Sequence, residues 1–329
     1  MSEPAGVMPP WLEAATAALV AARRSGRLPH ALLIHEAPGA GGGWLAHWAA
    51  RLALCERPEA PCGDCRECRR ALAWQHPDLM RVSPLEESKQ LRIEQVRELA
   101  AELTLTSHAG GYKVGILDPA DSMNRFAANA LLKTLEEPPP RTLLVLVASQ
   151  PSRLPPTVLS RCQRLAVRAP ARAAAVAWLT EVRGKGPWDA ALETVGEAPM
   201  LLLQADPAEL AQIGDETRKT LDAIAAGRSD PLAAAERWAR SELPLRLRCF
   251  ENWLTERIRR GSGPGNLMQE VRAGPYLQAG GAVLNIRELF GLLDEVRELR
   301  AAFDVPLNRA LALEALLRRL APRTAGAAA

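Results

Sequence analysis

Hydrophobic and polar positions alternate in two different ways along the chain, and the change falls near residue 170. Before it, short apolar runs at residues 31–35, 79–82, 112–118, 142–148 and 165–167 predict strands. Between the strands, the helical period recurs over residues 44–54, 92–105 and 124–137. The run TLLVLVA at 142–148 is apolar throughout, which is typical of a parallel strand covered on both faces. This alternation predicts a parallel α/β sheet domain over residues 1–170.

Beyond Pro170 the strand-like runs stop, and helical patterns rich in alanine and leucine take over. We predict a small helical domain over residues 171–207 and a helical bundle over 208–329. In the bundle, Leu247, Phe250 and Leu254 fall on one helix face. The predicted fold class is therefore α/β followed by all-α, in three domains.

The helix predicted at 124–137 is amphipathic and ends ahead of three prolines at 138–140. Proline disfavours helical geometry in the residue before it and offers no backbone donor. We predict that the apolar side chains of this helix face the core: Phe126, Ala130, Leu131 and Leu135.

The loop after the first strand, EAPGAGGGW at 36–44, resembles a phosphate-binding loop that has lost its polar groups. The full pattern is G-x-x-x-x-G-K-[ST], between a strand and a helix. When Gly39 and Gly41 are aligned with it, Gly42 takes the lysine position and Gly43 the hydroxyl position. Lysine reaches the outer phosphates and the hydroxyl binds Mg²⁺, and Glu36 takes the place of the first glycine. We favour a glycine-rich turn without a ligand over a real ATP site.

A second acidic position fits the same interpretation. The strand at 112–118 ends in Asp118, which is placed like the metal-binding aspartate of an ATPase. An active ATPase of this kind carries another carboxylate next to it to orient water, but here Pro119 follows. Asp118 could equally cap the end of its strand.

Four of the six cysteines are clustered with the spacing C-x6-C-x2-C-x2-C, namely Cys55, Cys62, Cys65 and Cys68. Four thiolates can surround one Zn²⁺ tetrahedrally, and four protein ligands describe a closed structural site. An iron–sulfur cluster is the alternative, but its bacterial motif continues with x3-C-P, which is absent here. We favour structural zinc over that cluster and over four independent core cysteines. Cys162 and Cys249 are predicted to be ordinary packed residues.

Composition and charge limit the classes of function. The 329 residues carry 41 basic and 38 acidic side chains, a net charge of +3. This balance does not favour a protein that binds nucleic acid alone, because such proteins usually have a strong basic excess. The sequence shows no signal peptide and no apolar stretch of 18 residues, so we expect a cytoplasmic protein.

Three segments resemble bacterial clamp-loader subunits, the AAA+ proteins of the DNA polymerase III holoenzyme. They read LPHALLI at 28–34, NALLKTLEEPP at 129–139 and LSRC at 159–162. The cysteine spacing fits the same family, and LNRALALE at 307–314 is similar to its last collar helix. The resemblance in sequence covers residues 28–170. In the helical remainder it is mainly a resemblance in the order of the predicted domains. It implies an AAA+ domain, a helical lid and a helical collar through which subunits assemble.

Within that family the chain resembles the non-catalytic δ′ type. The catalytic γ/τ type keeps an intact phosphate loop, and the segment GEAPM at 196–200 lacks the arginine that active relatives use as a nucleotide sensor. The resemblance implies no ATPase activity of its own and a place in a heteropentamer with γ/τ and δ, which loads the sliding clamp onto primed DNA. It also implies that Arg161 projects across an interface to a neighbour's ATP.

Two alternatives remain open. One is an active ATPase of the γ type, against which Gly42 and Gly43 speak. The other is a zinc-dependent DNA-binding regulatory protein built on the same fold, against which the near-neutral charge speaks. Nucleotide titration distinguishes the first alternative, and salt-dependent DNA binding by the isolated chain distinguishes the second.

Overall fold

The computed structural model describes residues 7–85, 88, 90–261, 276–279, 282–301 and 308–321. The chain forms two compact units. The first contains Met1–Val182 and Ala198–Leu203, and the second contains Arg183–Glu197 and Gln204–Ala329. The helical domain predicted at 171–207 contributes residues to both units, so the division into three domains stays a prediction. The segment predicted as the last collar helix begins at Leu307, which lies outside the described residues, and continues into them.

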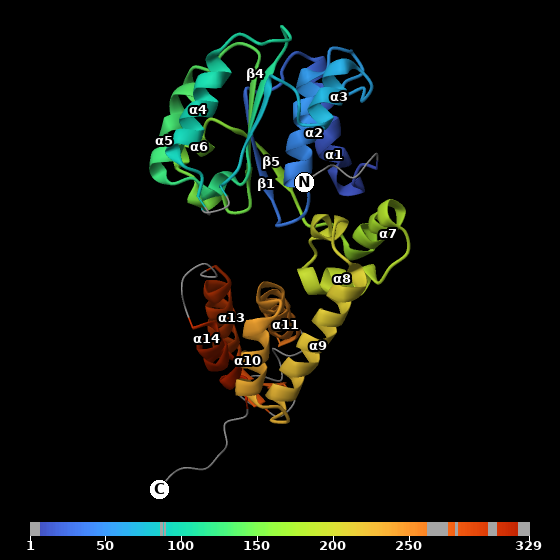
Figure 1. Cartoon of the computed structure of the whole chain (residues 1–329), viewed down its shortest axis with the longest axis vertical. Helices are drawn as coiled ribbons and strands as arrows, with labels where there is room; N and C mark the ends of the chain where they lie inside the picture. The colour runs from blue at the N-terminus through green and yellow to red at the C-terminus, as the bar shows by residue number, and fades with distance from the viewer. Residues whose placement is uncertain are drawn as a thin grey trace. The chain divides into compact units, whose positions relative to one another are not determined.

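The first unit contains a parallel sheet, in which Figure 1 labels β1, β4 and β5. Its five strands lie in the order β2-β3-β4-β1-β5. Its strands are β1 (Ala31–Glu36), β2 (Leu79–Val82), β3 (Lys113–Leu117), β4 (Thr142–Ala148) and β5 (Gln163–Val167). Every residue of β4 is buried, as its apolar run predicts. The α/β fold class expected from the sequence is confirmed. In such a sheet the loops at the carboxyl ends of the strands are where ligands bind.

Helices cover both faces of this sheet, with α4, α5 and α6 on one side and α1, α2 and α3 on the other (Figure 1). On the first side, apolar residues of these helices and of β1 and β4 form one buried cluster. The helices of the unit are α1 (Glu13–Arg24), α2 (Gly42–Leu54), α3 (Arg66–Leu72), α4 (Ile93–Thr104), α5 (Arg125–Glu136), α6 (Pro156–Leu159) and α7 (Arg172–Arg183). Short 3-10 turns occur at η1 (Pro10–Leu12), η2 (Ala120–Ser122), η3 (Pro151–Arg153) and η4 (Pro199–Leu203).

Helix α5 begins and ends where the sequence predicts, but one of its inward residues was predicted wrongly. The Asn124 side chain caps the helix by accepting the N–H of Ala127 at 2.9 Å. Leu131 and Leu135 are buried, whereas Phe126 is 72% exposed. The buried stripe runs through alanines of the first turn and leaves Phe126 beside it, because consecutive helical residues point about 100° apart.

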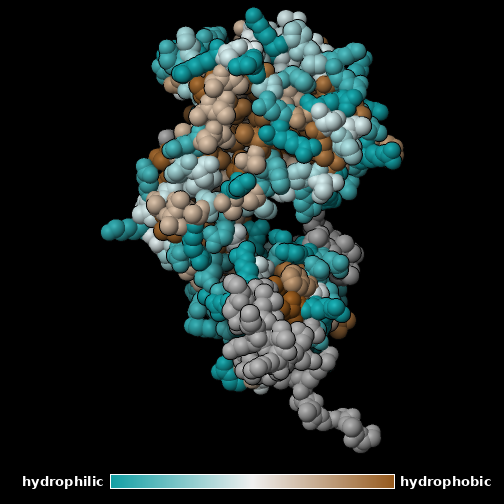
Figure 2. Space-filling view, turned by 180° about the vertical axis from the view of Figure 1, so that it is seen from behind, coloured by the Kyte–Doolittle hydropathy of each residue, from teal (hydrophilic) through white to brown (hydrophobic). Residues whose placement is uncertain are grey.

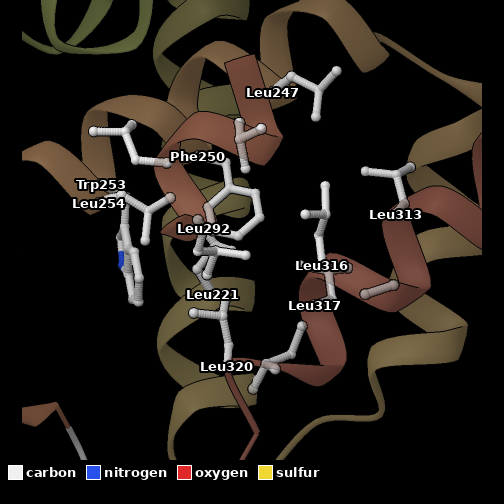
Figure 3. Close-up of a cluster of buried hydrophobic side chains, with 14 of the residues drawn as sticks. Leu221, Leu247, Phe250, Trp253, Leu254, Leu292, Leu313, Leu316, Leu317 and Leu320 are labelled. Atoms are coloured by element: carbon white, nitrogen blue, oxygen red, sulfur yellow. The ribbon is translucent and has the colours of Figure 1, made fainter. Parts of the chain in front are cut away.

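The second unit is helical in its larger part. Its helices are α8 (Trp188–Val195), α9 (Pro207–Ala225), α10 (Pro231–Arg240), α11 (Leu243–Gly261), α13 (Ile286–Ala301) and α14 (Arg309–Arg318), with a hairpin of β6 (Tyr276–Ala279) and β7 (Ala282–Asn285). Leu247, Phe250 and Leu254 of α11 point into one core with leucines of α9, α13 and α14 (Figure 3). The helix face predicted from the sequence is confirmed.

Hydrophobic side chains also reach the surface in the described part of the chain. Besides Phe126, Leu105 and Leu311 are more than half exposed. Figure 2 shows one face of the molecule, on which hydrophobic patches are bordered by hydrophilic residues. Among the described helices, none combines the length and the apolar character needed to cross a membrane.

Candidate functional site

The loop between β1 and α2 binds one of the protein's own carboxylates. Glu36 is the last residue of β1, and its Oε2 accepts the backbone N–H of Gly42 at 2.5 Å. Gly42 is the first residue of α2, where backbone N–H groups are free to hold an anion. A Cβ on Gly42 would lie 2.7 Å from the carboxyl carbon of Glu36. Glu36 therefore occupies the space that a lysine side chain would need.

The hydroxyl position of the loop is bordered by a carboxylate that follows β3. A Cβ on Gly43 would lie 3.0 Å from Oδ2 of Asp118, which follows β3. The same oxygen accepts a hydrogen bond from Nη2 of Arg81 on β2 at 2.9 Å. Asp118 is the residue compared above with a metal-binding aspartate. In the structure it forms an ion pair with Arg81 of the same chain.

The glycines of the loop are packed against the segment that carries η4 (Pro199–Leu203). The N–H of Met200 donates to the carbonyl of Gly39 at 3.1 Å. A Cβ on Gly39 would lie 2.6 Å from Cβ of Ala198, and one on Gly41 would lie 2.7 Å from Cε of Met200. Both glycines also have positive φ, 73° and 108°, which side chains rarely adopt. Glycine is therefore required at Gly39 for packing and at both positions for the turn.

Burial dominates the electrostatics of this loop. It raises the pKa of Glu36 to about 7, against a lowering contribution from the N–H of Gly42 and with a further increase from the charge of Asp118. An incoming phosphate would meet two carboxyl groups and neither lysine nor hydroxyl. The loop therefore lacks the two polar groups with which a phosphate loop binds a triphosphate.

The four clustered cysteines converge on one point. Their sulfurs, from Cys55, Cys62, Cys65 and Cys68, all lie within 4.8 Å of one another. The Cys55–Cys62, Cys62–Cys68 and Cys55–Cys65 sulfur pairs are 3.6, 3.9 and 4.0 Å apart. Four sulfurs placed tetrahedrally at about 2.3 Å from one ion are about 3.8 Å apart. These residues fit a single metal ion.

Local backbone geometry holds these sulfurs in place. Cys65 caps α3, and its sulfur accepts the N–H of Cys68 at 3.3 Å. The sulfur of Cys62 accepts the N–H of Cys65 at 3.4 Å. Such bonds favour the thiolate form, which is the form that binds metals. The two-residue spacers thus create a turn that directs three sulfurs inward, and Cys55 at the end of α2 adds the fourth.

A buried contact between a carboxylate and a histidine connects the cysteine cluster to the strand after it; burial lowers the pKa of His76 and so favours its neutral form. The carboxylate of Glu67, between two of the ligands, lies 2.9 Å from Nε2 of His76. Nδ1 of His76 accepts the N–H of Asp78 at 3.0 Å. His76 is therefore not part of the cysteine cluster but a buried partner of Glu67. Cys162 and Cys249 are both buried, as predicted.

Arg161 lies two residues after the end of α6. Its Nη2 lies 2.7 Å from Oε1 of Glu136, the last residue of α5. Its Nη1 donates to the carbonyl of Thr157 at 2.9 Å and to the hydroxyl of Ser160 at 3.3 Å. About a third of the Arg161 side chain stays exposed. The guanidinium is thus held by neighbouring groups yet accessible from outside.

Sequence patterns did not reveal several partners at these sites. Trp11 donates from Nε1 to the carbonyl of Ala40 at 2.7 Å, and Met200 packs on the same loop. Arg81 pairs with Asp118, and Glu136 pairs with Arg161. No sequence motif predicts any of these contacts. Glu136 does lie in a recognisable motif, LEEPP, but that motif does not indicate its partner.

Comparison with known proteins gives the family. The family described as "DNA polymerase III, delta subunit" matches residues 11–171. A DNA polymerase III subunit delta′ of Pseudomonas aeruginosa is 36% identical over 305 residues, which are 88% of this chain and 90% of that protein. The chain belongs to the family of DNA polymerase III delta′ subunits.

Two further relatives by sequence agree with this family. The delta′ subunit of Escherichia coli is 39% identical over 173 residues, 52% of each chain. The tau subunit of the same organism is 34% identical over 146 residues, which cover 44% of this chain and 22% of tau. A solved structure, a DNA polymerase III gamma-subunit-related protein from Thermotoga maritima, is 17% identical, with a TM-score of 0.45 over 92% of this chain and 98% of that one. The delta′ relatives by sequence confirm the predicted family.

Proposed function

We propose that this chain is a non-catalytic member of a clamp loader in the cytoplasm. It assembles with γ/τ and δ subunits in a five-membered complex and helps to load the sliding clamp onto primed DNA. The observation that carries the non-catalytic part is the carboxylate of Glu36 on the N–H of Gly42. A phosphate loop that holds its own anion, without lysine or hydroxyl, is a poor place for ATP.

The chain contributes to ATP hydrolysis in trans through Arg161. The guanidinium reaches the ATP of a neighbouring subunit and neutralises charge that develops on the γ-phosphate. Arginine suits this role because it stays charged and contacts phosphate oxygens with a planar fork. Fingers of this kind are worth on the order of 10³–10⁵ in rate at their own site.

Two measurements test this function. The isolated chain should neither bind nor hydrolyse ATP with Mg²⁺ in a calorimetric titration, whereas the γ-type alternative requires both. In the reconstituted complex, Arg161→Ala should lower DNA-stimulated ATP hydrolysis while the complex still assembles. An assembled mutant complex with an unchanged hydrolysis rate would refute the role in trans.

The four cysteines hold a structural Zn²⁺. The sulfur separations favour one ion over an iron–sulfur cluster, because the thiolates of such a cluster bind different irons and lie farther apart. With four protein ligands the ion has no open position for catalysis. Metal analysis of the purified chain should find about one zinc per chain; iron and visible colour would contradict the assignment.

A further inference from the structure

The side chain of Arg161 is held by a residue from a different motif. Glu136 belongs to the segment LLKTLEEPP and Arg161 to the segment LSRC, 25 residues later. Their ion pair has an N–O distance of 2.7 Å, and about half of the Glu136 side chain is exposed. The pair therefore lies at the surface, where a neighbouring subunit could reach the arginine.

The two ends of this pair are fixed by a common core. Leu135, next to Glu136, and Val158 and Cys162, on either side of Arg161, are all buried in the same apolar cluster. Proline follows Glu137 and ends the helix there, so the carboxylate sits on the last turn of α5. Both backbone segments are thus packed in the same core, and the two side chains meet at its edge.

The guanidinium of Arg161 is bound on two sides, by its own segment and by Glu136. Nη1 is held by the carbonyl of Thr157 and the hydroxyl of Ser160, and Nη2 by Glu136. An arginine side chain that no neighbouring group holds loses considerable rotamer freedom when it binds a phosphate. Groups that hold it beforehand reduce that loss and so favour the transition state.

We propose that Glu136 is a positioning residue for Arg161, which it orients toward the ATP of the neighbouring subunit. This inference rests on the proposed role of Arg161 in trans. Glu136 does not touch the nucleotide; it acts through the arginine. The pairing also gives a physical reason for the glutamate of LLKTLEEPP and the arginine of LSRC to occur together in one chain.

The experiment is ATP hydrolysis by the reconstituted complex, with DNA and clamp, for Glu136→Gln, Arg161→Ala and the double variant. Glutamine keeps the size and an acceptor but removes the charge. Glu137→Gln is the matched control, because it removes an exposed carboxylate from the neighbouring position. Assembly of each complex is checked by size-exclusion chromatography.

The part of kcat that depends on Arg161 is the difference between the wild type and Arg161→Ala. We expect Glu136→Gln to lower this part about two- to fivefold, the range for an exposed ion pair, with KM for ATP unchanged. Glu137→Gln should leave it unchanged, and Glu136→Gln should have no further effect when Arg161 is already alanine.

Each other outcome overturns the inference. If Glu136→Gln equals Glu137→Gln while Arg161→Ala lowers the rate, Glu136 does not position the arginine, and the proposed function stands. An equal loss in the Arg161→Ala background would show a general structural effect. A higher rate in Glu136→Gln would show that the carboxylate restrains the arginine. An unchanged rate in Arg161→Ala would refute the proposed function itself.

Discussion

Glu36→Gln tests whether the carboxyl group in the loop after β1 is kept there at a cost in stability. Burial is the main cause that raises the pKa of Glu36 from its ordinary 4.5 to about 7. The folded state therefore binds this proton more tightly than the unfolded state does. As pH rises from about 4.5 to 7, the stabilisation from the bound proton is lost, and the ionised carboxylate destabilises the fold.

The size of this effect follows from the two pKa values. One pKa unit corresponds to about 1.4 kcal/mol, so at pH 8 the buried carboxylate destabilises the first unit by roughly 3 kcal/mol. At pH 5 the folded protein keeps the proton, and the effect is below about 1 kcal/mol. Glutamine has the same shape, stays neutral and still accepts the N–H of Gly42. We therefore expect Glu36→Gln to stabilise the first unit more at pH 8 than at pH 5, by roughly 2 kcal/mol.

Hydrogen exchange of the β1 and β4 amides reports the stability of the first unit alone. Wild type and variant are compared at each pH, so that contributions from other titrating groups cancel. Glu98→Gln is the control, since it removes an exposed carboxylate of α4 in the same unit. If Glu36→Gln changed stability by the same amount at pH 5 and pH 8, the reasoning from burial would be wrong.

Two further predictions concern local structure in the first unit. Removing the metal with a chelator, or replacing Cys65 by serine, should lower the melting temperature. Either change weakens the metal site that cross-links the turn between α2 and α3. An unchanged melting temperature would show that metal is not needed for stability. Asn124→Ala should destabilise the unit by about 1 kcal/mol, measured by urea unfolding, because it removes the cap of α5; Asn129→Ala, on the exposed face of the same helix, is the control.

The sheet was predictable because its signals are local. An apolar run such as TLLVLVA can be satisfied only by burial on both faces, and β4 is buried throughout. The inward face of α5 was less certain, because hydrophobic residues occur on more than one side of its first turn. The core took Ala127 and Ala128 and left Phe126 exposed. Periodicity gives the spacing of a stripe, but tertiary packing selects which stripe is buried.

The candidate sites follow the same rule. The cysteine cluster was predictable because its ligands fall within 14 residues and a turn alone brings them together. The contact between Gly39 and Met200 joins residues 161 positions apart, and no sequence pattern links them. Glu36 was visible as a misplaced carboxylate, but its bond to Gly42 required the geometry of the strand end and the helix start. Sites formed by residues close together in the sequence could therefore be predicted from it, whereas contacts between distant residues could not.

The loop after β1 differs from a phosphate loop by more than the missing lysine and hydroxyl, so introducing those two side chains should not create ATP binding. In Gly42→Lys/Gly43→Thr the new Cβ atoms meet Glu36 at 2.7 Å and Asp118 at 3.0 Å. A carboxylate about 4 Å from a phosphate charge costs about 4 kcal/mol at an effective dielectric constant of about 20, which corresponds to roughly a thousandfold in affinity. Adding Glu36→Gly to this pair should therefore tighten binding of a fluorescent ATP analogue with Mg²⁺ at pH 8. Equal affinity with and without Glu36 would show that the carboxylate does not exclude the nucleotide.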